Sequence, residues 1–95
     1  MQPNALAFSP DSSHLALVTA DASAVELYNL ATGTLEQRYV PRSGQKITCI
    51  GYPSQEELLA IDISGAVENL LRGEQIYRLP KGQVARSLKR TQRAG

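Results

Sequence analysis

Apolar residues in this chain of 95 residues gather in short runs, and turn-forming residues separate one run from the next. The run His14–Thr19 is nearly continuous in its apolar character, which predicts a strand covered on both faces. Val25–Leu30 alternates instead, and Pro, Asp, Ser and Gly between the runs predict tight turns. The expected strands are 5–9, 14–19, 25–30, 35–40, 47–52, 58–63, 66–71 and 75–79. A helix is the rival over Glu56–Ala60, but the β-branched residues and the glycine that follow favour a strand.

The pattern occurs twice along the chain. An apolar strand ends in an aromatic residue and Pro, and three more strands follow, with a Gly turn before the last. The copies are about 44 residues apart at Leu6 and Ile50, and about 40 apart at Gly33 and Gly73. An Ala-Val-Glu strand stands in each copy, at 24–26 and at 66–68. A period of about 40–45 residues with four short strands is typical of a β-propeller blade.

Particular residues resemble the WD40-repeat family over roughly residues 4 to 82. Phe8-Ser9-Pro10-Asp11 is similar to the family's strand-end turn, and Val25–Leu30 with Thr32-Gly33 is similar to its third strand and exit turn. Tyr28-Asn29 stands where Trp-Asp is usual, and we expect Leu70-Leu71 to replace that dipeptide in the second copy. The Gly-His pair that often precedes a blade is absent. The resemblance implies an all-β fold of about two divergent four-stranded WD40-like blades, packed mainly by apolar contact without the usual side-chain hydrogen-bond network.

The resulting division is a first blade-like repeat at 1–43, a second at 44–82 and a basic, flexible tail at 83–95. Complete propellers have about four to eight blades, so two blades form an incomplete propeller with an apolar face at each end. We therefore expect the missing blades to come from another chain or from further sequence. A free-standing β-sandwich is the structural alternative, and it would enclose one core without an exposed end face.

A narrower resemblance links Ala7-Phe8-Ser9-Pro10, Leu35–Pro41 and Thr48-Cys49 to one group of WD-repeat subunits. These are subunits of the eukaryotic small-subunit processome, of the Utp-five type in the U-three-protein A subcomplex. The resemblance covers about 45 residues, most of them structural. It implies a nucleolar scaffold that binds other propeller proteins and pre-ribosomal RNA during ribosome assembly.

Composition narrows the class of protein further. Hydrophobic residues make up 42% of the chain and Trp is absent, so the core must be built from aliphatic side chains. A single cysteine excludes an intrachain disulfide, and we expect Cys49 to be a buried core residue. The N-terminus lacks a secretory pattern, and the apolar runs fall short of the roughly 20 residues that cross a membrane. We expect an intracellular protein without membrane contact, nucleolar if the processome resemblance holds.

Charge divides the chain into two parts. Residues 1–79 hold five basic and nine acidic residues, which gives −4, whereas residues 80–95 hold five basic residues and no acid. Such a tail can neutralise phosphates, but it carries no aromatic residue for base stacking. The alternative is a solubilising terminus or a linker. The candidate contacts to nucleic acid or an acidic partner are Lys81, Arg86, Lys89, Arg90 and Arg93.

Candidate chemistry is sparse elsewhere in the chain. We interpret His14 as a solvated turn residue, and three aspartates as turn residues that bond the backbone. One His and one Cys, 35 positions apart, do not make a metal site, and single scattered glycines do not cradle phosphate. Glu56-Glu57 fits a solvated loop tip or a charged interface. The four tyrosines fit core or blade-interface packing. The aspartates are Asp11, Asp21 and Asp62; the tyrosines are Tyr28, Tyr39, Tyr52 and Tyr77.

The sequence therefore predicts no catalytic, metal or cofactor site. Its first hypothesis is a non-enzymatic scaffold of WD40 type, acting by contact with other proteins in a larger assembly such as a ribosome-assembly particle. The alternative is an RNA-associated module that uses the basic tail. A third hypothesis, an accessory propeller of a hydrolase, requires chemistry in sequence outside these residues.

Overall fold

The structure is a computed structural model that describes residues 5–79, and these residues form eight strands and no helix. All the expected strands are present, and their ends move by at most two residues. Strand rather than helix is confirmed over Glu56–Ala60, which joins a turn to β6. The strands are β1 (Leu6–Phe8), β2 (His14–Val18), β3 (Val25–Asn29), β4 (Thr34–Tyr39), β5 (Ile47–Ser54), β6 (Glu57–Asp62), β7 (Ala66–Asn69) and β8 (Glu74–Arg78).

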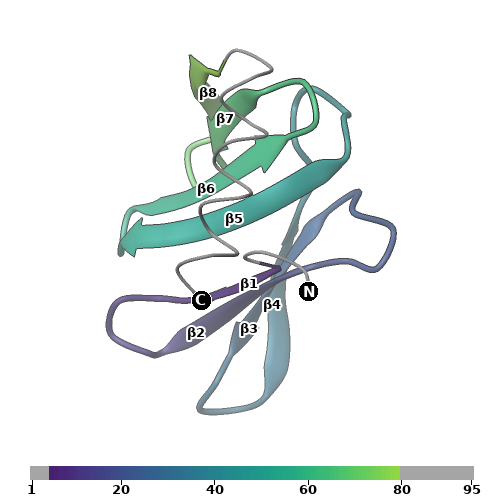
Figure 1. The fold of residues 1–95 in the computed structure, drawn as a ribbon. Coiled ribbons are helices and arrows are strands. Elements are labelled where there is room, and N and C mark those ends of the chain that lie inside the picture. The colour runs from purple at the N-terminus through teal and green to yellow at the C-terminus, as the bar shows by residue number, and fades with distance from the viewer. Residues whose placement is uncertain (1–4, 80–95) are drawn as a thin grey trace, which may run out of the picture.

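The strands form two antiparallel sheets of four, each in chain order, β1-β2-β3-β4 and β5-β6-β7-β8. Figure 1 shows the first sheet in purple to blue and the second in teal to green. The sheets do not close on each other, and they meet mainly where β1 and β2 contact β5. The all-β class is confirmed, and the arrangement is consistent with two incomplete propeller-like blades. We call β1–β4 the first blade and β5–β8 the second blade.

Aspartates organise the turns between strands, as the sequence predicts. The Asp11 carboxylate accepts hydrogen bonds from the Ser13 amide and hydroxyl, at 3.0 and 2.6 Å. Asp21 accepts the same two bonds from Ser23, at 3.1 and 2.7 Å. The two amide bonds satisfy backbone donors that the turn removes from the strand ladder, which is why Asp favours such positions.

The hydrophobic core lies between the two blades. Val25 and Leu58 are its largest fully buried side chains. Tyr39 and Tyr52 pack against its margin, as expected, and Tyr28 is half-buried. Tyr77 is 60% exposed and lies outside this core, so its expected packing at a blade interface stays a prediction. The core residues are Ala16, Val25, Leu27, Ile47, Ile50, Leu58, Ala60 and Leu70.

The last two strands of each blade match closely in structure. Gly33 N donates to Asn29 O at 2.7 Å, and Gly73 N donates to Asn69 O at 2.8 Å. Each blade also has a β-bulge two residues earlier, after Leu27 in the first and after Val67 in the second. Asn69 is thus the counterpart of Asn29, and the expectation that Leu70-Leu71 occupies this dipeptide position is wrong.

The sequence pairs Ala24–Glu26 with Ala66–Glu68, an offset of 42 residues, whereas Asn29 and Asn69 are 40 apart. The Ala-Val-Glu alignment is therefore shifted by two residues from the structural one. The connection between β2 and β3 has six residues, Thr19–Ala24, whereas the connection between β6 and β7 has three, Ile63–Gly65. This connection is shorter by three residues, which accounts for most of the fall in the repeat spacing from about 44 to about 40 along each copy. A two-residue shift keeps side chains on the same face of a strand, so the sequence pattern concealed it.

The bulges also show how the blades stack. Leu27 belongs to the core between the blades, while its counterpart Val67 does not. Val67 lies opposite Ile61 on the face of the second blade that points away from Ile50 and Ala60. Corresponding faces therefore point the same way, and the blades stack head to tail. A sandwich with equivalent inner faces would instead place Leu27 and Val67 in one core.

Candidate interaction surfaces

The outer side of the first blade carries an apolar face that no described residue of the second blade covers. Strand register places Leu6 opposite Leu17, Phe8 opposite Leu15, and Leu15 opposite Tyr28. Because paired residues share one face of a sheet, these side chains lie together, opposite to the core residue Ala16. We call this surface the open face; its members are Leu6, Phe8, Leu15, Leu17, Tyr28 and Leu35.

Exposure of the open face is greatest at its two edge strands. Leu6 and Phe8 on β1 are 50% and 54% exposed, and Leu35 on β4 is 48% exposed. The residues on the central strands are half-buried by their neighbours. Large apolar side chains gathered on one face mark an interaction surface more often than a plain solvent surface.

Charged groups also lie on this side of the first blade, where Glu26 on the central strand β3 is opposite Leu17. Glu26 lies opposite Arg38, and the Tyr28 hydroxyl donates to Glu26 Oε1 at 3.0 Å. This hydrogen bond, together with desolvation and the nearby negative charge, raises the pKa of Tyr28. Protein interfaces commonly combine apolar and polar groups in this way.

A buried carboxylate joins the linker between the blades, residues 40–46, to the second blade. Asp62 is only 4% exposed, and it accepts the Ser43 hydroxyl at 2.6 Å and the Ser64 amide at 2.8 Å. It also accepts the Ser64 hydroxyl at 2.6 Å and the Ala66 amide at 3.1 Å. Burial acts to raise the pKa of Asp62, but these hydrogen bonds outweigh it and hold the pKa below its ordinary value. Asp62 therefore stays ionised and fixes the linker against the β6–β7 turn.

Further polar contacts hold the blades in their relative position. The Asp11 amide donates to Gln55 Oε1 at 3.0 Å, which joins the corresponding β1–β2 and β5–β6 turns. The Arg42 amide donates to the buried Glu68 carboxylate at 2.9 Å. Ile47 N donates to Ala22 O at 2.8 Å. These bonds bridge distant parts of the sequence, so the open face is presented on a preformed scaffold.

His14 is not the solvated turn residue that the sequence suggests. It begins β2, and its ring contacts Ser13 Oγ at 2.7 Å and Glu36 Oε1 at 2.8 Å. Asn29 donates to the second oxygen of Glu36 at 2.7 Å. This chain of hydrogen bonds links three strands of the first blade, so a side-chain network forms here. Its members differ from the usual ones because Glu36 joins the imidazole to the asparagine.

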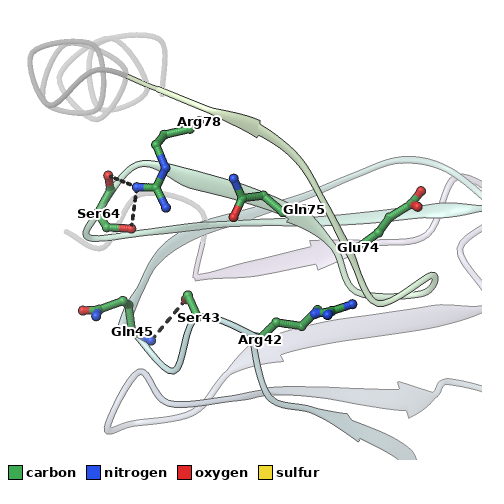
Figure 2. Close-up of a pocket in the computed structure, with 7 residues that line it drawn as sticks. All are labelled: Arg42, Ser43, Gln45, Ser64, Glu74, Gln75 and Arg78. Atoms are coloured by element: carbon green, nitrogen blue, oxygen red, sulfur yellow. Dashed lines mark hydrogen bonds between the residues drawn. The ribbon is translucent and has the colours of Figure 1, made fainter.

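A polar pocket of about 650 Å³ lies between the linker and the outer strand β8 (Figure 2). Arg42 Nη1 donates to the backbone oxygen of Gly73 at 2.7 Å. Arg78 Nη1 donates to the backbone oxygen of Ser64 at 3.1 Å and to its hydroxyl at 3.3 Å. The lining residues are Arg42, Ser43, Gln45, Ser64, Glu74, Gln75 and Arg78.

Sequence reasoning did not find this pocket. Arg42 lies in a linker and Arg78 on the last strand, and neither belongs to a basic cluster in the sequence. They share a pocket only because the linker runs past β8 in the folded chain. The basic residues that the sequence predicts to contact nucleic acid or an acidic partner lie outside the described residues, so this role stays a prediction. They are Lys81, Arg86, Lys89, Arg90 and Arg93.

The remaining candidates have structural roles. Cys49 is buried, and burial raises the pKa of its thiol, which disfavours the reactive thiolate. Glu56 is largely exposed and lies 3.3 Å from Arg72, while Glu57 accepts the Ser54 hydroxyl at 2.9 Å. Within residues 5–79, no three His, Cys, Asp or Glu side chains gather closely enough to hold a metal ion. Nor does this part of the chain contain a helix long and apolar enough to cross a membrane.

Comparison with models of known protein families gives no match to the chain. Comparison with curated protein sequences gives no match either.

Proposed function

We propose that this chain is a non-enzymatic interaction module of WD40 type, which works within a multi-protein assembly. The open face is the observation that carries the proposal, because it presents large apolar side chains beside a well-packed core. Full burial of such a side chain contributes about 1.5–3 kcal/mol, and covering the exposed half of Leu6, Phe8 or Leu35 contributes a part of it.

Head-to-tail stacking defines what should cover this face. Within the chain, the first blade offers small and branched side chains, such as Ala16 and Val25, to the second blade. A head-to-tail contact between unlike faces can be repeated until a ring closes. The proposed partner is therefore another propeller blade, supplied by a second protein. The face of that blade which corresponds to the Ala16 and Val25 side of the first blade packs against Phe8 and its neighbours.

A ribosome-assembly particle is the assembly that the narrower resemblance implies, and we retain it as the setting of this proposal. The alternative is RNA association through the basic tail. The two proposals differ in the surface that they use, since the open face lies on β1–β4 and the tail follows residue 79.

A photo-crosslinking amino acid at position 8 tests the proposal. The same amino acid at position 63 is a matched control, because Phe8 and Ile63 are both 54% exposed but Ile63 lies in the β6–β7 turn. We expect crosslinks from position 8 to a strand of a propeller protein in an extract of the source cells, and few from position 63. The purified partner should then bind the wild-type chain but not Phe8→Asp.

Three results would contradict this proposal. They are a stable monomer without crosslinks at position 8, equal crosslinking at both positions, and unchanged partner binding by Phe8→Asp. Association that survives ribonuclease treatment and deletion of residues 80–95 would reject the RNA alternative. Loss of association after either treatment, while the Phe8→Asp variant still associates, would favour the RNA alternative.

A further inference from the structure

The pocket between the linker and β8 carries two guanidinium groups without a carboxylate partner among residues 5–79. In this part of the chain, ion pairs form only between His14 and Glu36 and between Arg72 and Glu56. Arg42 and Arg78 instead bond backbone oxygens. Each guanidinium has five N–H donors, so most of its donors remain available for a ligand.

Both arginines are held in place before any ligand arrives. Their bonds to Gly73 O and Ser64 O use groups that belong to tight turns of the second blade. Holding a long side chain in advance lowers the entropy that binding would otherwise lose. Fixed guanidinium groups are well suited to carboxylate and phosphate oxygens, which they can bind through two parallel hydrogen bonds.

The rest of the lining distinguishes between classes of anionic ligand. Gln45 and Gln75 offer amide groups that can pair with a peptide backbone, and Figure 2 shows Gln75 between the two arginines. The lining contains no aromatic side chain, so a nucleic-acid base has no stacking surface here. We propose that this pocket binds an acidic peptide segment, with Asp or Glu side chains engaging the two guanidinium groups.

The arrangement of charge predicts which arginine matters more. Figure 2 shows Glu74 near the Arg42 end of the pocket, while Arg78 lies beside the neutral Ser64. A carboxylate ligand is repelled by Glu74, so the Arg78 end is the stronger position for an acidic side chain. This site lies away from the open face, so its failure would leave the proposed function intact.

Fluorescence anisotropy on the full chain tests the pocket. The probe is a short labelled peptide in which Glu alternates with Ser, compared with the same peptide carrying Gln for Glu. We expect Arg78→Ala to weaken binding about tenfold or more, and Arg42→Ala by less. Arg72→Ala is the matched control, because it removes the same charge from an exposed position outside the pocket and should leave affinity unchanged.

Retention of the wild-type thermal midpoint by each variant shows that the fold persists. Arg78→Lys keeps the charge but loses the planar fork, so an affinity between those of wild type and Arg78→Ala supports a geometric site. Equal weakening by Arg72→Ala and Arg78→Ala would overturn the proposal, because only general charge would then matter. Equal binding of the Gln peptide, or tighter arginine-dependent binding of a labelled oligouridine, would overturn it as well.

Discussion

Replacement of Asp62 by alanine tests whether burial, rather than the number of hydrogen bonds, decides the importance of a turn aspartate. Asp62 is 4% exposed and accepts bonds from Ser43, Ser64 and Ala66. Asp62→Ala leaves the Ser64 and Ala66 amides without an acceptor in a site that water reaches poorly. An unsatisfied buried amide costs about 1–3 kcal/mol, so we expect a loss of about 3 kcal/mol in the free energy of unfolding.

Asp21→Ala is the internal control for this prediction. Asp21 accepts three hydrogen bonds, from the Thr19 hydroxyl and from the amide and hydroxyl of Ser23, at a comparable β2–β3 turn. It is exposed, so water can replace the lost acceptor. We expect its effect to be less than half that of Asp62→Ala.

Urea unfolding followed by tyrosine fluorescence measures both effects, since the chain has four Tyr and no Trp. With a slope of about 1.5 kcal/mol per molar urea, Asp62→Ala should lower the midpoint by about 2 M. Asp62→Asn keeps one acceptor oxygen and should lose about half as much, which gives a measurement if the alanine variant does not fold. Equal losses for Asp62→Ala and Asp21→Ala would refute the reasoning.

Two further predictions concern acid stability and the core. Hydrogen bonds from Ser13 and Ser23 lower the pKa of Asp11 and of Asp21 from the ordinary 3.8 to about 2. A depressed folded-state pKa gives stability that is present above pH 3.8 and lost towards pH 2, so thermal midpoints should fall across that range. A thermal midpoint that does not change between pH 3.8 and pH 2 would contradict this prediction. Leu58→Ala removes a fully buried side chain and should cost about 2–5 kcal/mol in urea unfolding, whereas no measurable loss would contradict its core position.

The sequence alone determined the local structure of the described residues. Alternating and continuous apolar runs predicted the eight strands, because a strand exposes its faces with a period of two residues. Asp11 and Asp21 marked turns correctly, since a short carboxylate bonds amides within a few residues of itself. The repeat correctly indicated two four-stranded units. These features depend on interactions between near neighbours in the chain.

Only the tertiary structure decided which residues meet across the chain. The counterpart of Asn29 is Asn69, because the bulge and the turn set the register and the apolar pattern tolerates a shift of two residues. The sequence left His14 in a turn, since its partner Glu36 lies 22 positions away. The pocket between Arg42 and Arg78 was equally hidden, because it exists only where the linker passes the outer strand. Contacts of this kind depend on the packing of the blades, which no local pattern specifies.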